Sequence, residues 1–323
     1  MRTILILLLC LLCAPLVGAQ TYITLFEDDF DTDTSANWTL FQDSGTGTPD
    51  YTAEFSYDYS ADGVPPAPNT TGGTTRGLKL TANNNDSIPD PAAVNVYPNG
   101  QSFSGDFRLT VDAYMSFDRG MVGSTEFILA GINHLGTQIN WHNSTTSDGR
   151  FFAATAEGGA AQDYRSYTGN PSGAPTWNNN DAAAFLLGFP DRNGDGLADD
   201  NNIDPALAEI WPATAYEVAG SPFNASSVGA SPWVEIEIRQ EGGVISWSLA
   251  GVTMCSTLET SSFTSGNIML GYMDIWSSIS GDPPAQFGIF DNVKVEQITY
   301  GPTPTPTNTP IITGTDTMWK DYR

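Results

Sequence analysis

The sequence predicts an all-β protein, a two-sheet antiparallel β-sandwich of the jelly-roll type. Three observations favour this fold class. Short runs between residues 20 and 300 alternate apolar and polar side chains, clusters of Gly, Asn, Asp, Pro and Ser separate these runs, and helical periodicity is nearly absent. Many short strands joined by turn-rich segments are typical of a sandwich, and a hydrophobic content of 40% is enough for its core.

The expected strands can be justified in chain order. The run 107–117 alternates strictly, so one of its sides should face a core and the other water. In 233–239, Val234, Ile236 and Ile238 share one face, while two glutamates and an arginine share the other. Gly242 and Gly243 then supply a turn into 244–249, which predicts a hairpin. The runs 268–276 and 287–298 supply two further strands.

The two ends of the chain differ from this middle part. Residues 1–19 carry Arg2, a short apolar run and a small-residue ending, the pattern of a secretory signal peptide. The alternative, a membrane anchor, would need a longer apolar run. Residues 301–323 begin with alternating Pro and Thr, which cannot form a core and predict an extended linker and a short tail. The domain itself is therefore expected at 20–300, secreted or at the cell surface.

Charge and cysteine content exclude several classes. A net charge of -25, from 12 basic and 37 acidic residues, disfavours nucleic acid and anionic membranes as partners. No later segment is apolar enough to insert into a bilayer. Cleavage after residue 19 would leave Cys255 as the one cysteine, so the exported protein would have no internal disulfide and would depend on a large core or on metal.

Three short motifs resemble the concanavalin A-like lectin and glucanase superfamily, a LamG-like jelly roll of the kind found in secreted bacterial-type surface proteins. They are Phe26-Glu-Asp-Asp-Phe30 with Asn37-Trp38, the hairpin 233–251, and the closing Phe290-Asp-Asn-Val-Lys-Val295. The resemblance implies that the first and last strands pair. It covers about residues 20–300, and the superfamily holds lectins, hydrolases, lyases and structural modules, so it implies a fold more than an activity.

An oxygen-rich segment near 191–204 predicts a structural Ca²⁺ site. Its spacing of oxygen ligands, with Gly196 at the bend, matches a calcium loop, although Asn202 stands where a bidentate acid is usual, so Asp200 or Asp204 would complete the shell. The alternative is a solvated acidic loop. The candidate ligands are Asp191, Asn193, Asp195, Leu197, Asp199, Asp200, Asn202 and Asp204. By resemblance, a second calcium could lie where Asp28 or Asp29 meets Asp291, although carboxylates facing water are the favoured interpretation there.

No catalytic motif is evident. The strand motif Glu-x-Asp-x-x-Glu of the retaining glucanases is missing, and the nearest run, 235–241, has the character of a charged outer face. His134 and His142 could serve a lyase, but structural roles are favoured. Enzymatic activity is therefore left open, with a non-catalytic protein preferred.

Aromatic side chains in polar, loop-like stretches are candidates for stacking on a sugar ring. They are Trp141, Tyr164, Tyr167, Trp177 and Trp276. The leading hypothesis is a secreted, calcium-stabilised, non-catalytic module that binds a glycan or cell-surface polysaccharide, or serves in adhesion. The alternatives are an extracellular glycoside hydrolase or polysaccharide lyase, and a purely structural envelope glycoprotein.

Removal of calcium should destabilise this protein if the segment 191–204 binds the ion. A ligand that binds only the folded state, present well above its dissociation constant, contributes about 2–4 kcal/mol. We therefore expect a chelator to lower the Tm by about 5 °C or more, and excess calcium to restore it. A Tm that does not change with chelator would contradict the site.

Overall fold

The computed structural model describes residues 20–83, 88–116, 126–155, 164–177, 233–279 and 283–301. The chain divides into two units, Tyr22–Ile298 and a smaller one formed by Met1–Thr21 with Thr299–Arg323. In the described part of the smaller unit, the hydroxyl groups of Thr21 and Thr299 share a hydrogen bond of 2.6 Å. The segments 1–19, 191–204 and 302–323 lie outside the described residues, and so do the predictions made for them.

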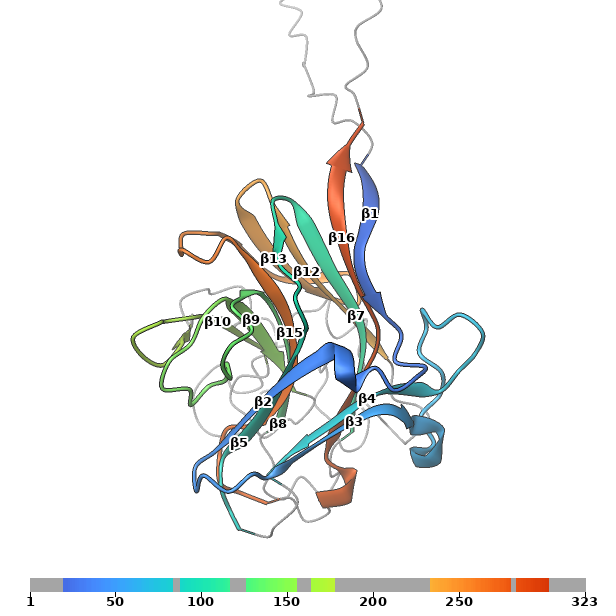
Figure 1. Cartoon of the computed structure of the whole chain (residues 1–323), viewed down its shortest axis with the longest axis vertical. Helices are drawn as coiled ribbons and strands as arrows, with labels where there is room; N and C mark the ends of the chain where they lie inside the picture. Colours follow the sequence, from blue (N-terminus) through green and yellow to red (C-terminus); the bar gives the residue numbers. More distant parts are fainter. Residues whose placement is uncertain are drawn as a thin grey trace, which may run out of the picture. The chain divides into compact units, whose positions relative to one another are not determined.

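The larger unit is a sandwich of two eight-stranded antiparallel sheets (Figure 1). Sheet A has the order β14-β13-β12-β7-β16-β4-β3, with β1 paired to β16, and sheet B has the order β11-β10-β9-β8-β15-β5-β2, with β6 paired to β15. The strands of sheet A are β1 (Gln20–Asp28), β3 (Tyr51–Asp58), β4 (Arg76–Ala82), β7 (Phe107–Ser116), β12 (Val234–Glu241), β13 (Val244–Leu249), β14 (Val252–Leu258) and β16 (Phe287–Tyr300). Those of sheet B are β2 (Trp38–Ser44), β5 (Ala92–Pro98), β6 (Phe103–Ser104), β8 (Glu126–His134), β9 (Arg150–Ala154), β10 (Tyr164–Thr168), β11 (Thr176–Trp177) and β15 (Ser265–Asp274).

The predicted fold class is confirmed. Within the described ranges, the other regular elements are three short 3-10 turns, η1 (Ser35–Asn37), η2 (Tyr59–Asp62) and η3 (Pro283–Ala285). In this part of the chain no helix is long and apolar enough to span a bilayer. The pairing of β1 with β16 is the pairing of first and last strands that the resemblance implied (Figure 1).

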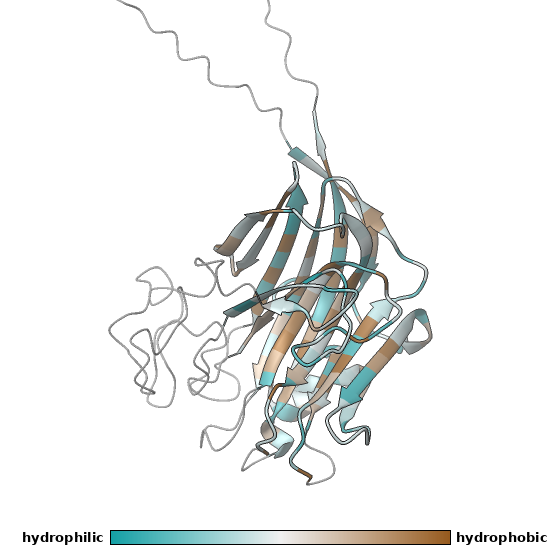
Figure 2. Ribbon diagram, turned by 90° about the vertical axis from the view of Figure 1, so that its left-hand side faces the viewer, coloured by the Kyte–Doolittle hydropathy of each residue, from teal (hydrophilic) through white to brown (hydrophobic). Residues whose placement is uncertain are grey.

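The main core lies between the sheets and follows from the alternation in the sequence. Figure 2 shows apolar and polar positions alternating along the strands. On β12, the side chains of Val234, Ile236 and Ile238 are buried in this core, as predicted. The predicted hairpin is also confirmed, because β12 and β13 pair around a two-residue turn in which Gly242 and Gly243 have φ of 58° and 78°. Positive φ at both turn residues is what a type I′ turn requires and glycine permits.

The outer face of sheet B is also covered. Phe127, Phe151 and Tyr167, from β8, β9 and β10, belong to a second apolar cluster that is buried on the side of the sheet away from the main core. Trp141, from the segment between β8 and β9, joins this cluster and donates a hydrogen bond from its Nε1 to Asp43 at 3.2 Å. This face of the sheet is therefore a second core rather than a solvated surface.

One end of the outer face of sheet A is covered by the segment between η2 and β4. Tyr59 and Tyr114 form a third apolar cluster there, against which Trp233 packs. The indole of Trp233 donates a 2.8 Å hydrogen bond to the carbonyl of Pro65, and the hydroxyl of Tyr59 accepts one of 3.2 Å from the Ala67 backbone. These contacts hold the segment 64–75 over the sheet. The alternation of β7 predicted an outer side that faces water, and this cover is why Tyr114 is buried instead.

Replacing a tryptophan by alanine should lower stability strongly at one position and hardly at all at another. Trp247 is 1% exposed and stacks on Phe152, so Trp247→Ala should lower the free energy of unfolding by about 3–5 kcal/mol. Trp276 is 59% exposed, so Trp276→Ala should change it by no more than about 0.5 kcal/mol. Denaturant unfolding of both variants measures the difference. Equal losses would contradict the placement of Trp247 in the core.

Candidate functional site

Three carboxylates lie in a row on the outer face of sheet A. Asp112 of β7 is directly opposite Glu235 of β12 on one side and Asp291 of β16 on the other. Asp112 and Asp291 are 0% and 1% exposed, whereas Glu235 reaches solvent. Like charges opposite one another in a sheet repel, so this row needs neighbours that donate hydrogen bonds or a cation that offsets the charge.

Asn69, from the segment over sheet A, links two of these carboxylates. Its Nδ2 donates to Asp112 Oδ1 at 2.8 Å and to Glu235 Oε2 at 3.2 Å, and its backbone amide donates to Asp112 Oδ2 at 3.1 Å. The two accepting side-chain oxygens can therefore be no more than about 6 Å apart. The position of the segment 64–75, fixed by Tyr59 and Trp233, thus determines the geometry of the row.

Asn292 supplies the donors from the other side. A bulge between Asp291 and Lys294 adds a residue to β16, and Asn292 takes a φ of 52°, a left-handed conformation that asparagine tolerates better than most residues. The bulge directs the Asn292 side chain to Asp112 Oδ2 at 2.9 Å and to the Thr70 hydroxyl at 2.9 Å. The backbone amide of Asn292 donates to Asp291 Oδ1 at 2.7 Å.

The remaining oxygen of Asp291 is held by neutral groups. Its Oδ2 accepts hydrogen bonds from the hydroxyls of Tyr59 at 3.0 Å and Thr70 at 3.1 Å. Burial raises the pKa of Asp291 to about 7, and burial also raises the pKa values of Asp112 and Glu235. The row therefore holds protons more readily than carboxylates in water do.

A pocket of about 860 Å³ opens over this row. Its lining comes from β7, β12 and β16, from the end of β1 and the residues up to η1, and from the segments 69–71 and 99–101. Amide side chains are prominent in it: Asn37, Asn69, Asn99, Gln101 and Asn292. Six carboxylates also line it: Glu27, Asp28, Asp29, Asp112, Glu235 and Glu296.

Two cations, Arg108 and Lys294, face these six acids. Arg108 forms ion pairs with Glu237 at 3.0 Å and Glu296 at 2.7 Å, and its guanidinium lies 3.8 Å from the centre of the Tyr22 ring. Lys294 makes no ion pair within the described ranges. The pocket is therefore negatively charged as well as rich in hydrogen-bonding groups.

None of the five aromatic candidates is among the described residues that line this pocket. Trp141, Tyr164 and Tyr167 are at most 2% exposed, so in this structure a sugar ring cannot stack on them. The physical reason is that the outer face of sheet B, which the strand pattern alone would leave to solvent, is a second core, and that Tyr164 faces the main core. Trp177 lies in β11, opposite Tyr167, and its side chain is outside the described part. Trp276 is exposed and stays a candidate.

The other candidates have structural partners or fall outside the described residues. The calcium-loop segment 191–204 is outside them. Asp28 accepts hydrogen bonds from the Phe30 amide at 2.9 Å and from the Trp38 indole at 2.8 Å. Asp28 and Asp29 line the pocket, but Asp291 does not. Across the described ranges, no group of three or more His, Cys, Asp or Glu side chains is arranged to hold a metal ion.

The two histidines also have partners within the protein. His134 is fully buried and shares a 2.9 Å hydrogen bond with Asp148, and His142 shares one of 3.1 Å with the Tyr167 hydroxyl. Burial lowers the pKa of His142 to about 4, so its ring is neutral at pH 7. Neither histidine lines the pocket.

Sequence reasoning missed Asn69 and Asp112, the residues that organise the site. In the sequence, Asp112 is one polar position in an alternating strand, and Asn69 lies in a loop without a recognisable motif. The Asp291-Asn292 pair belongs to the closing motif of the family resemblance, which gives Asn292 no role. Two adjacent polar residues inside an otherwise alternating strand are a signal of a bulge, and that signal could have pointed to Asn292.

No family model matches the chain, and no curated protein is similar to it in sequence. Among solved structures, a protein of unknown function with a galectin-like fold from Bacillus subtilis is similar over 87% of this chain and 100% of its own, at 10% identity and a TM-score of 0.45. The Ca²⁺/Man2-bound exoplasmic/lumenal domain of VIP36 is similar over 85% of this chain and 88% of its own, at 10% identity and a TM-score of 0.44. An endo-beta-1,3-glucanase from Pyrococcus furiosus is similar over 87% and 96%, at 10% identity and a TM-score of 0.43. At TM-scores this low, these similarities carry no inference about ligand or activity.

Protonation of Asp291 should make stability depend on pH in a definite direction. Because the folded-state pKa is about 7 and the ordinary value is 3.8, the folded state binds the proton more tightly. The contribution of the protonated Asp291 to stability is then complete below about pH 4. It is lost as pH rises towards 7, by up to about 1.4 kcal/mol per pH unit. Asp291→Asn has no carboxyl group that titrates at this position. The unfolding free energy of the variant, relative to that of wild type, should therefore increase from pH 4 to pH 7.

Denaturant unfolding of both proteins across this range measures that difference. The absolute stability of Asp291→Asn matters less than its trend, because an amide cannot accept all the hydrogen bonds that Asp291 accepts. A difference that stays constant with pH would show that Asp291 titrates normally in the folded protein.

Proposed function

We propose that this protein is a secreted carbohydrate-binding module and that the pocket over sheet A is its glycan site. One observation carries the proposal: the pocket is lined by five amide side chains together with carboxylates and threonines. An amide both donates and accepts hydrogen bonds, and a sugar hydroxyl needs both. The volume of about 860 Å³ is in the usual range for a small-molecule site.

Secretion and stabilisation by calcium are parts of the same proposal. The signal-peptide pattern of residues 1–19 supports export, and the oxygen-rich spacing at 191–204 supports a structural Ca²⁺. Both are supported by sequence pattern alone. Glycan binding by the pocket does not depend on either of them.

A glycoside hydrolase is a second candidate, and one specific observation favours it. Asp112 and Glu235 carry oxygens no more than about 6 Å apart, they line an open pocket, and burial raises both of their pKa values. Retaining glycosidases place their two carboxyl groups about 5–5.5 Å apart, and the general acid among them has a raised pKa. Binding without turnover remains the preferred function, because Asp112 is fully buried and is held by three hydrogen bonds that would oppose its movement.

Loss of pocket amides should weaken glycan binding without unfolding the protein. We expect Gln101→Ala and Asn69→Ala each to lower affinity by about tenfold for glycans found on an array, since each removes hydrogen bonds to the ligand. Asn143→Ala is the matched control, because Asn143 is exposed and does not line the pocket. Gln101→Ala is the more informative variant, since Asn69 also holds Asp112 and its loss can disturb the fold.

The same glycans distinguish binding from catalysis. The array is read with and without calcium, and bound glycans are then incubated with the protein in solution and examined for cleavage products. Binding without product supports the module, and product that disappears in Glu235→Gln supports the hydrolase. Binding that is unchanged in both amide variants would place the glycan elsewhere, and no binding at all would favour a purely structural glycoprotein.

A further inference from the structure

The pocket carries more acidic than basic side chains, and this imbalance bears on the charge of the glycan that it would bind. Six carboxylates line it against two cations, and Arg108, one of those cations, is paired with Glu296, one of those carboxylates, and with Glu237, and lies against Tyr22. An acidic sugar entering this pocket would meet the other five carboxylates, with Lys294 as the one unpaired cation among the described lining residues. A positively charged sugar would meet the complementary field.

Glu235 is the carboxylate best placed to contact such a ligand. It reaches solvent in the pocket, whereas Asp112 and Asp291 lie beside it in the same row and are buried. The donors around the row are directed inward, since Asn69 and Asn292 both donate to Asp112. Asn69 is also the one donor to Glu235 among the described contacts, and it is shared, so the Glu235 carboxylate retains free acceptor capacity toward the pocket.

The exposed end of β1 adds charge at the edge of the pocket. Glu27 and Asp29 are exposed there and make no ion pair in the described part of the chain. Asp28, between them, is instead turned toward Phe30 and Trp38. The carboxylates without an ion pair in the described part thus come from the end of β1 and the residue after it, from β7 and from β12, and they border one volume rather than forming a patch on a flat surface.

We propose that the pocket selects glycans that carry a free, protonated amino group over the same glycans with that amine acetylated, and over acidic glycans. This rests on the proposed function. An ammonium group donates three hydrogen bonds and carries a charge opposite to the net charge of the pocket, whereas an acetamide offers one N–H and no charge. The amide side chains would bind the hydroxyls of either form, and the carboxylates set the preference between them.

Matched pairs of oligosaccharides test this selectivity. The full chain is titrated calorimetrically at pH 6 with glucosamine and galactosamine oligomers, each beside its fully N-acetylated counterpart, and with an oligogalacturonate. We expect the free-amine form of at least one pair to bind about tenfold more tightly than its acetylated form. The preference should decrease as NaCl is raised from about 20 mM to 500 mM, because salt screens charge, and the oligogalacturonate should bind most weakly.

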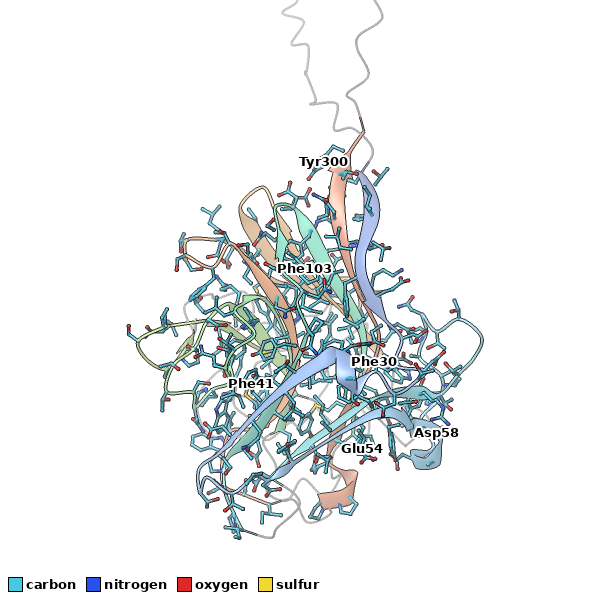
Figure 3. The ribbon with its side chains drawn as sticks, viewed as in Figure 1. Phe30, Phe41, Glu54, Asp58, Phe103 and Tyr300 are labelled. Atoms are coloured by element: carbon cyan, nitrogen blue, oxygen red, sulfur yellow. The ribbon has the colours of Figure 1, made fainter. Side chains whose placement is uncertain are left out.

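Two variants locate the preference. Glu235→Gln keeps the shape of the side chain and removes its charge, so it should reduce the ratio of free-amine to acetylated affinity by about three- to tenfold and leave the acetylated form little changed. Glu54→Gln is the control: Glu54 is an exposed glutamate of β3 that does not line the pocket (Figure 3). It should leave the ratio as in wild type.

The outcomes separate the proposed function, glycan binding by the pocket, from the proposed preference for a free amine. Equal affinity for both members of every pair would overturn the selectivity and leave a glycan-binding pocket in place. A free-amine preference that is the same in wild type, Glu235→Gln and Glu54→Gln would come from the general negative charge of the protein and would also overturn it. If no glycan binds, or if Gln101→Ala weakens the binding of none of them, the proposed function and the selectivity are both wrong.

Discussion

β16 hydrogen-bonds to β7 along most of its length, to β4 in its first part and to β1, so one strand joins the beginning, the first third and the end of the domain. Its inner side chains, Phe290, Val293 and Val295, belong to the main core. Its outer side chains contribute Asp291, Asn292 and Lys294 to the carboxylate row and the pocket. The sandwich and the candidate site therefore depend on the same set of backbone hydrogen bonds, and neither is complete without the last strand.

The carboxylate row shows how a sheet can hold unfavourable charge. Asp112 and Asp291 are adjacent and buried, with no cation within ion-pairing distance of either in the described structure. Amide and hydroxyl donors from Asn69, Thr70, Asn292 and Tyr59 replace the hydrogen bonds that water would have made. Their number is enough for the hydrogen-bonding needs of the oxygens, but burial still favours the neutral acid over the carboxylate, which is why the pKa of Asp291 is raised to about 7. A cluster of this kind costs stability, and in folded proteins such a cost is commonly found at functional sites.

Local pattern was sufficient to predict much of the fold. The alternation in β12, the two glycines that follow it and the return in β13 specify a hairpin through contacts between near neighbours in sequence. The burial of Trp141 and Tyr167 could not be predicted in that way, because it depends on a segment between β8 and β9 that covers a sheet face which strand periodicity treats as open. The site was harder still. Asn69 meets Asp112 and Glu235 across 43 and 166 residues of sequence, and no local pattern links the three.

The left-handed residue in β16 has a consequence for how chains of this fold can vary in length. Without Asn292, the sequence from Phe290 onward would alternate regularly, with Val293 and Val295 still in the core and Asp291 and Lys294 still outside. The strand would keep its inward face and its register with the core. It would lose the side chain that joins Asp112 to Thr70 and the backbone amide that donates to Asp291. A single-residue deletion at this point would therefore remove the Asn292 donors from the carboxylate row and leave the contacts of Asn69 with Asp112 and Glu235 in place.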